Sequence, residues 1–226
     1  MENLKDKIKK YAVSRGADLV GIASVDRFDG APDGHKPTDI LSDAKTVIVC
    51  AKRLPNSVVV RGLATSYSHM MDVLSDRLDL IAYEMAISIE QQGGVAVPVP
   101  SGEPYYDWDP DRSHGRGDLS HKHAAQAAGL GRLGKNSLLI TPEFGNRVEL
   151  VSIVTSLDLE PDPSVEKELC PSKCMICIES CPVNAIASEQ QVNQKACRSH
   201  MILKLPHGET IESCRECRRV CPAGLK

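Results

Sequence analysis

The fold is decided by the stretch Cys170-Pro-Ser-Lys-Cys174-Met-Ile-Cys177-Ile-Glu-Ser-Cys181-Pro182 and by a second run, Cys214-Arg-Glu-Cys217-Arg-Arg-Val-Cys221-Pro222. Both runs end in the pattern C-x2-C-x3-C-P, and Cys197 lies between them. In the bacterial arrangement that holds two four-iron, four-sulfur (4Fe–4S) clusters, the last cysteine of such a run binds the other cluster. The spacing therefore predicts a ferredoxin-like module with two 4Fe–4S clusters and crossed ligands.

The eight cysteines of this region divide into two sets of four with none left over. The first set is Cys170, Cys174, Cys177 and Cys221, and the second is Cys181, Cys197, Cys214 and Cys217. Two zinc sites are the alternative, but zinc ribbons lack the repeated C-x3-C-P tail. One departure is the x3 spacing between Cys170 and Cys174, where the bacterial run has x2. The pattern favours clusters over zinc.

The composition narrows the class of protein. The 226 residues include 27 Lys and Arg against 30 Asp and Glu, a formal charge of −3, and no long basic run marks a nucleic-acid surface. No stretch approaches the roughly 18 consecutive apolar residues of a membrane span, and the charged segment Met1 to Lys10 is unlike a signal peptide. We therefore expect a cytoplasmic protein that neither enters a membrane nor binds nucleic acid by default.

The ninth cysteine, Cys50, lies in a strand-like run and is expected to be a small buried hydrophobe.

Helical and strand patterns alternate before the cysteines. We expect helices at 4–15, 67–92 and 121–128, and strands at 18–23, 47–51, 95–99, 137–141 and 147–155. The polar, aromatic segment 101–117 is expected at the surface or over a ligand. These patterns predict an α/β or α+β layered domain over residues 1–160, a Pro-rich linker at 158–163, and the cysteine module over 161–226.

A glycine-rich run follows the Ala-rich helix. Gly129-Leu-Gly131-Arg-Leu-Gly134-Lys135-Asn136 contains a G-x-G-x-x-G pattern and nearly a phosphate-binding loop. Such loops follow a strand and open a helix, whereas this run follows a helix and opens a strand, and Asn136 replaces the hydroxyl that binds magnesium. We interpret these glycines as positions where the backbone approaches a large flat ligand or makes a tight turn.

Ionisable side chains gather at the start of the same helix. His121 and His123 flank Lys122, and Asp118 lies nearby. Such a group could donate protons or hold polar parts of a ligand, and the alternative is a solvated helix end. The sequence leaves both interpretations open.

Together, three features resemble the epoxyqueuosine reductase family. They are the segment Gly16 to Ala23, the double cysteine tail, and the run A-G-L-G-x-x-G-K-N-x-L-L-I-x-P-E-x-G at Ala128 to Gly145. The resemblance implies a cobalamin-binding, nitroreductase-like N-terminal domain related to reductive dehalogenases, with the corrinoid reduced by the clusters. Residues expected on this basis to bind the cofactor or substrate are His123, Gly129, Gly131, Gly134, Lys135, Asn136 and Tyr67.

Two departures from the family pattern bear on activity. The family's V-D-S-A-P-like run, whose Asp donates a proton, has no secure counterpart here, and we expect Asp118 or His121 to take that role. The chain also stops at Lys226, without the C-terminal helical-repeat domain that the resemblance associates with tRNA contact. With the overall charge of −3, this leads us to expect a small substrate in place of tRNA.

The leading hypothesis is thus an oxidoreductase in which a low-potential donor, a ferredoxin or flavodoxin, reduces two clusters that pass electrons to a base-off cobalamin for chemistry on a small substrate. One alternative is an electron-transfer protein that activates a separate corrinoid partner. The other is a short epoxyqueuosine reductase acting on tRNA.

The crossed assignment makes a prediction about Cys181 and Cys221. Cys181→Ser should remove the cluster held by Cys214 and Cys217, because Cys181 belongs to the opposite set. Electron paramagnetic resonance (EPR) of the reduced Cys181→Ser variant should then show only the signal of the first cluster, which is the signal that Cys174→Ser loses. Loss in Cys181→Ser of the same signal as in Cys174→Ser would contradict the crossing.

Overall fold

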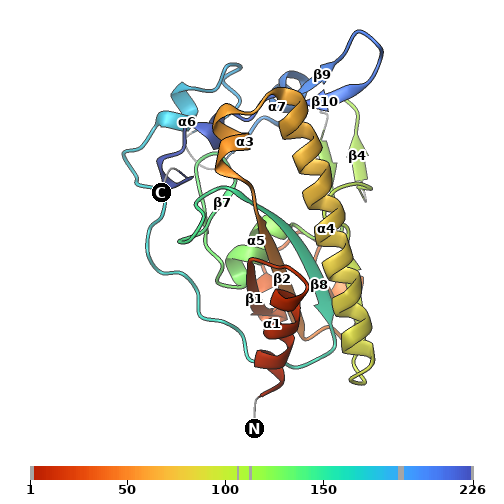
Figure 1. The fold of residues 1–226 in the computed structure, drawn as a ribbon. Coiled ribbons are helices and arrows are strands. Elements are labelled where there is room, and N and C mark those ends of the chain that lie inside the picture. Colours follow the sequence, from red (N-terminus) through yellow and green to blue (C-terminus); the bar gives the residue numbers. More distant parts are fainter. Residues whose placement is uncertain (1–2, 106, 112–113, 188–190, 225–226) are drawn as a thin grey trace.

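The centre of the molecule is a four-stranded antiparallel sheet. The computed structural model describes residues 3–105, 107–111, 114–187 and 191–224 (Figure 1). The strand order is β1-β2-β8-β3. The strands are β1 (Leu19–Ser24), β2 (Thr46–Arg53), β3 (Ala96–Val99) and β8 (Val148–Thr155), and each neighbouring pair is antiparallel. The N-terminal part is therefore an α+β layered domain.

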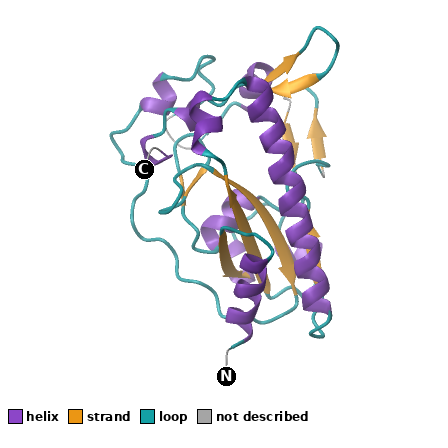
Figure 2. Cartoon of the chain, viewed as in Figure 1, coloured by secondary structure: helices purple, strands orange, loops and turns teal. Residues whose placement is uncertain are grey.

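The two central strands are buried on both faces. In β2, Ile48 and Cys50 face one core cluster, and Val47 and Val49 face the other. This alternation follows from the two-residue period of a strand. Figure 2 shows helix α4 lying across one side of the sheet, and the two clusters identify three layers, helix on sheet on helix.

Helices α1 (Leu4–Ser14) and α4 (Ala64–Glu90) cover the first face. α1 begins at Asn3, whose side chain accepts a hydrogen bond from the Asp6 backbone N–H, and the chain turns beyond it at Gly16, which has φ of +104°. In α4 the buried residues recur every three or four positions, as a helix packed on a sheet requires. Among them are Leu74, Leu78, Ile81, Met85 and Ile89.

Helix α5 (His121–Ala127) covers the second face at close range. Ala124, Ala125 and Ala128 are fully buried there. A Cβ on Gly21 of β1 would lie 2.5 Å from the Ala128 carbonyl oxygen. Small side chains on both elements therefore let the helix rest directly on the strand.

The remaining elements are short. Those before the cysteines are η1 (Val25–Phe28), α2 (Pro37–Ile40), α3 (Asn56–Arg61), β4 (Asp107–Asp109), β5 (His114–Arg116), β6 (Arg132–Leu133) and β7 (Leu139–Ile140). Those of the cysteine module are α6 (Ile176–Glu179), α7 (Gln194–Met201), β9 (Ile202–Lys204), β10 (Thr210–Glu212), α8 (Glu216–Arg219) and η2 (Pro222–Gly224). In Figure 1 the module's labelled elements gather at the end of the molecule opposite the N-terminus.

Most of the expected elements are confirmed, and Cys50 is fully buried as predicted. The expected strand at 137–141 begins two residues later than predicted, because Ser137 has φ of +59°; Leu139–Ile140 pairs with β6, and Thr141 forms a bridge with Gly145. The segment 101–117 contains the hairpin β4–β5, which was not predicted; Tyr106, Arg112 and Ser113 lie outside the described residues.

Among the described helices, none combines the length and apolar character needed to cross a bilayer.

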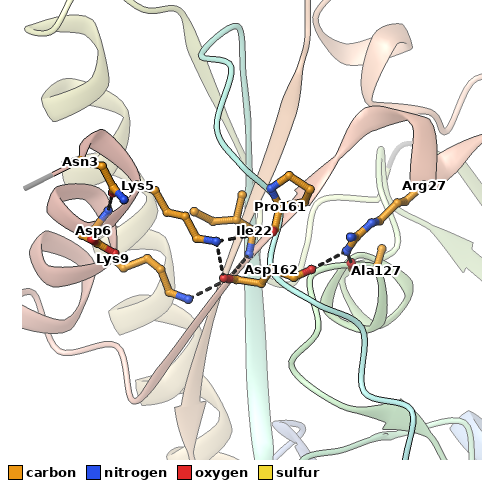
Figure 3. A network of polar contacts seen from close by, with 9 residues as sticks. All are labelled: Asn3, Lys5, Asp6, Lys9, Ile22, Arg27, Ala127, Pro161 and Asp162. Atoms are coloured by element: carbon orange, nitrogen blue, oxygen red, sulfur yellow. Dashed lines mark hydrogen bonds and ion pairs between the residues drawn. The ribbon is translucent and has the colours of Figure 1, made fainter.

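The predicted linker is fixed to the domain at Asp162 (Figure 3). Its carboxylate accepts from Lys5 at 2.8 Å, from Lys9 at 2.7 Å and from the Ile22 backbone N–H at 3.0 Å. Its backbone carbonyl accepts from Arg27, which also donates to the Ala127 carbonyl. One residue thus joins α1, β1 and the end of α5 to the segment that leads into the cysteine module.

Asp162→Asn should destabilise the fold by about 1–3 kcal/mol, because it removes a charged acceptor of three hydrogen bonds. Burial acts to raise the pKa of Asp162, but hydrogen bonds from Lys5 and Lys9 outweigh it, and the pKa is lowered. The stabilisation is therefore present above the unfolded-state pKa of about 3.9 and disappears as the pH falls through the lower folded-state pKa.

The test is urea unfolding of both proteins at pH 7 and at progressively lower pH, with Asp158→Asn at an exposed position as the control. A wild-type advantage that does not shrink in acid would contradict the assigned role.

Candidate cluster and cofactor sites

The two cysteine runs meet through their short helices. Cys177 lies on α6 and Cys217 on α8, and these helices contact each other. Cys197 lies on α7. Cys177 and Cys217, which are 40 positions apart in sequence, are therefore brought to one place.

The thiols fall into two neighbourhoods. Burial raises the pKa of Cys177, and three nearby thiols raise it further: Cys170, Cys221 and Cys174. Burial also raises the pKa of Cys197, and two nearby thiols add to the effect: Cys214 and Cys181. Each neighbourhood combines one run with the last cysteine of the other, which is the grouping expected from the crossed spacing.

Backbone N–H groups point at the two crossing cysteines. The Ala185 N–H donates to the Cys181 sulfur at 3.2 Å. Burial raises the pKa of Cys221, while the backbone N–H groups of Ala223 and Gly224 act to lower it. A proline follows each of these cysteines and begins the turn that presents the N–H groups. Such donors stabilise negative charge on sulfur.

The donor set suits iron–sulfur clusters. Both neighbourhoods consist of thiols, and a 4Fe–4S cluster is held by four cysteine thiolates. Among the described residues, no three His, Cys, Asp or Glu side chains are arranged to hold a single metal ion.

Lys135 and Asn136 hold the cysteine loops. Lys135 Nζ donates to the carbonyl oxygens of Pro171 at 3.1 Å, Ser172 at 2.5 Å and Cys174 at 2.7 Å. Asn136 Nδ2 donates to the Cys217 carbonyl at 3.3 Å, and Asn146 Nδ2 to the same oxygen at 3.4 Å. Lys135 and Asn136 therefore hold the cysteine runs in place, and their expected cofactor contact stays a prediction.

Three glycines of the segment Ala128 to Gly145 lie against backbone atoms of other segments. An added Cβ would lie 2.2 Å from the Pro163 oxygen at Gly129, 2.1 Å from the Ile140 oxygen at Gly131, and 2.2 Å from the Ala223 oxygen at Gly145. At Gly134 it would lie 2.7 Å from the Ile140 Cδ1 atom. The tight-turn interpretation fits Gly129 and Gly145, which have positive φ, and of these glycines only Gly131 also lines the large cavity.

A cavity of about 900 Å³ lies between the α/β layer and the cysteine module. One wall comes from η1 and α5, and another from residues 164–166 and from Gln194 at the start of α7. Gly30, Gly115 and Gly117 also line it, so that part of its wall is bare backbone. Its size is at the upper end of the range for small-molecule sites, about 300–1,000 Å³.

The cavity is rich in positive charge. Its cationic lining residues are Arg27, Arg116, Lys122 and Arg132, and its one acidic lining residue among the described residues is Glu166. The three arginines match no sequence motif, because they come from short elements that are far apart in the chain: η1, β5 and β6. A cavity of this charge suits a ligand that carries phosphate.

The ionisable residues of α5 divide between the cavity and the core. His123 and Lys122 line the cavity. Burial lowers the pKa of both, and Lys122 lowers that of His123 further. His123 Nδ1 hydrogen-bonds with Ser120 Oγ at 2.7 Å, so Nε2 is the ring nitrogen that remains for a ligand.

The expected proton donors do not line the cavity. His121 lies within 2.9 Å of Ser152 Oγ through Nδ1 and within 2.7 Å of the Pro100 carbonyl through Nε2. Because both ring nitrogens are engaged, His121 ties α5 to the sheet, and the geometry does not support it as a proton donor. Asp118 is half-buried between Gly117 and Leu119, which do line the cavity.

Tyr67 lies elsewhere, beside the second cysteine run. It is 4% exposed, and the Arg215 guanidinium lies 5.2 Å from the centre of its ring. Arg215 also donates to the Val59 carbonyl at 2.9 Å, joining α3 to the residue next to Cys214. The structure therefore places Tyr67 beside the cysteine module, and it does not line the large cavity.

Comparison with known proteins identifies a class that shares this fold. No family model matches the chain. An epoxyqueuosine reductase from Streptococcus thermophilus superposes with a TM-score of 0.71 at 23% identity, over 100% of this chain and 67% of that one. A structure of epoxyqueuosine reductase with an epoxyqueuosine-modified tRNA-Tyr stem loop gives 0.70 at 23%, over 98% of this chain and 65% of the other. A reductive dehalogenase described for B12-dependent dehalogenation gives 0.70 at 20%, over 95% and 31%. The chain thus has the α/β fold common to epoxyqueuosine reductases and reductive dehalogenases.

Among these, the sequence resembles the epoxyqueuosine reductases, which confirms the predicted resemblance. The chain is 27% identical to the epoxyqueuosine reductase of Bacillus subtilis over 97% of its own length and 63% of that protein's. It is 29% identical to the Bacillus anthracis enzyme over 98% of its own length and 64% of the other's. The chain therefore spans less than two thirds of the length of these relatives.

Gly145 makes the closest of these contacts to the second cysteine run, so Gly145→Ala should displace the turn after Cys221 and disturb the cluster neighbourhood that contains it. We expect iron content after reconstitution to fall toward half of the wild-type value, together with a lower unfolding midpoint. The matched control is Gly93→Ala, which has φ of +81° but nothing within 4 Å of an added Cβ. Equal iron loss in both variants would show that backbone strain, not the contact, is responsible.

Proposed function

We propose that the chain is a reductase of the epoxyqueuosine type, in which two 4Fe–4S clusters deliver electrons to a cobalamin bound in the large cavity. The observation that carries the proposal is the position of this cavity. It lies between α5 and the cysteine module, and its wall includes Gln194, three residues before Cys197 on the same helix. A ligand held there would be within a short distance of a cluster-binding thiolate.

In this proposal residues 161–226 form the cluster module and residues 1–160 the cofactor and substrate domain. The first cluster takes Cys170, Cys174, Cys177 and Cys221, and the second takes Cys181, Cys197, Cys214 and Cys217. The thiol neighbourhoods around Cys177 and Cys197 support this division. Lys135 and Asn136 position both loops from the first domain.

The cavity wall suits a large flat cofactor. Its glycines offer bare backbone, and Gln194 Oε1 is buried without a hydrogen-bond partner among the described residues, so it is available to an amide of a bound group. Cobalamin, when bound, supplies the redox-active metal at which a substrate is reduced. Gln126, Gln194 and His123 are the residues that would hold its polar periphery.

The reaction also needs protons. Removing an epoxide oxygen as water consumes two electrons and two protons, and the clusters carry electrons one at a time. His123 presents Nε2 to the cavity and lies next to Lys122 in sequence. We assign proton delivery to His123 Nε2, in place of the expected Asp118 or His121.

The substrate we propose is epoxyqueuosine in tRNA rather than a small free molecule. The relatives that match nearly the whole chain are epoxyqueuosine reductases, and one structural neighbour was solved with a modified tRNA stem loop. The overall charge of −3 led to the opposite expectation because it averages over the whole surface. The local charge of the cavity is positive, and a phosphate backbone responds to the local charge.

The reconstituted protein should convert epoxyqueuosine in tRNA to queuosine when given cobalamin and a low-potential reductant. Three assays separate the alternatives: optical titration with cob(II)alamin, turnover of a modified stem loop, and turnover of the free nucleoside. Turnover of the nucleoside as fast as the stem loop would favour a small substrate. Absence of any spectral change with cobalamin would favour an activator of a separate corrinoid protein.

Arg116→Ala should weaken binding of the stem loop by removing one phosphate contact, and the slope of log affinity against log salt should fall by about 1. Fluorescence anisotropy at several salt concentrations measures both quantities. Arg77→Ala, an exposed arginine on α4, serves as the control. An unchanged affinity and slope for Arg116→Ala would remove this residue from the nucleic-acid surface.

A further inference from the structure

Arg147 is the largest fully buried side chain in the described part of the protein, with an exposed fraction of 1%. It lies immediately before β8, on the face of the domain that meets the cysteine module. Its backbone carbonyl accepts from the Leu54 N–H at 2.9 Å, which fixes the main chain at the end of β2. Arg147 has no part in the electron and proton transfer proposed for the cavity.

Among the residues that the structure describes, no acid forms an ion pair with Arg147. Its Nε and Nη2 atoms are buried and have no hydrogen-bond partner among the described residues. The neighbouring cations Arg218 and Arg53 oppose its charge, and the favourable charge comes from the Cys221 thiolate. A buried cation with unused donors requires an anion, because burial without one is strongly unfavourable.

Packing directs the guanidinium toward the turn after Cys221. A Cβ on Gly224 would lie 2.7 Å from Arg147 Nε, so that only glycine fits between them. The N–H groups of Ala223 and Gly224 in this same turn act on the Cys221 sulfur. Arg147 therefore packs against the same turn whose backbone N–H groups act on the Cys221 sulfur.

The second cluster neighbourhood has a different arrangement. Its buried arginine, Arg218, is paired with Glu149 at 2.7 Å and donates to the Val148 carbonyl at 3.4 Å. This ion pair is neutral as a unit. The two proposed clusters thus differ in their surroundings: one has an unpaired buried cation beside it and the other has a compensated one.

We propose that Arg147 donates to the first cluster on its Cys221 side and makes the reduction potential of that cluster less negative than that of the second. The inference rests on the proposed function, since it assumes that the clusters are present. Reduction adds one electron, and hence one negative charge, to the cluster, and an external donor such as dithionite supplies it. A fixed neighbouring cation stabilises the added charge, and hydrogen bonds to sulfur act in the same direction.

The test compares Arg147→Gln, which removes the charge and keeps only one amide N–H2 donor group on a shorter side chain, with Arg147→Lys, which keeps the charge. EPR-monitored redox titration with dithionite gives the midpoint potential of each cluster, and the signal absent from Cys174→Ser identifies the first cluster. We expect the first potential to become more negative in Arg147→Gln, a smaller shift in Arg147→Lys, and no change at the second cluster. Arg219→Gln, which removes an exposed arginine two residues from Cys221, should leave both potentials unchanged.

Unchanged potentials in an Arg147→Gln protein with full iron content would overturn the proposal, as would equal shifts at both clusters. Iron loss in Arg147→Gln but not in Arg147→Lys would support a requirement for the cation, whereas equal loss in both would assign Arg147 to packing alone. The readout needs neither cobalamin nor tRNA. Failure of the wild-type protein to bind two clusters would count against the proposed function and not against the comparison of variants.

Discussion

The cysteine module depends on its backbone contacts with the domain that precedes it. After residue 160 the buried hydrophobic side chains among the described residues are Cys177, Ala185 and Ile186. So small an apolar core cannot by itself fix about 60 residues of chain, and small modules of this kind rely on metal centres or on docking. Here Lys135 and Asn136 donate to carbonyl groups in both cysteine runs, and Gly145 lets the last turn approach closely. The run at 129–136, which resembles a phosphate-binding loop in sequence, therefore holds the cysteine module against the first domain.

The same arrangement creates the cavity. The chain leaves the sheet at β8, is fixed by Asp162 to α1 and β1, and then passes along the open side of α5 before it reaches the first cysteine. The cavity lies where this segment faces the helix, and its wall includes residues from both parts of the protein. In the proposed function, a few polar anchors would couple cofactor binding to cluster placement, because a shift of the segment would change both.

Much of the fold follows from local sequence. The regular spacing of apolar residues in α1 and α4 predicted both helices, and the continuous apolar runs predicted β2 and β8, because these elements bury the faces that their periodicity defines. The cysteine spacing predicted which thiols lie near Cys177 and Cys197. The partners of polar side chains were not predictable in this way. Lys135 bonds to carbonyl groups more than 35 residues away, His121 turns into the core, and Arg147 faces a turn 75 residues later, and no local pattern encodes such pairings.

The central claim is that one chain holds two four-iron clusters next to a cofactor cavity. Iron, acid-labile sulfide and cobalt content of the anaerobically prepared protein, measured per chain after reconstitution with cobalamin, tests it most directly. We expect eight irons and eight sulfides per chain, since each 4Fe–4S cluster contains four of each. We also expect one cobalt per chain, from the bound cobalamin. Four irons or fewer, or zinc in place of iron, would contradict it.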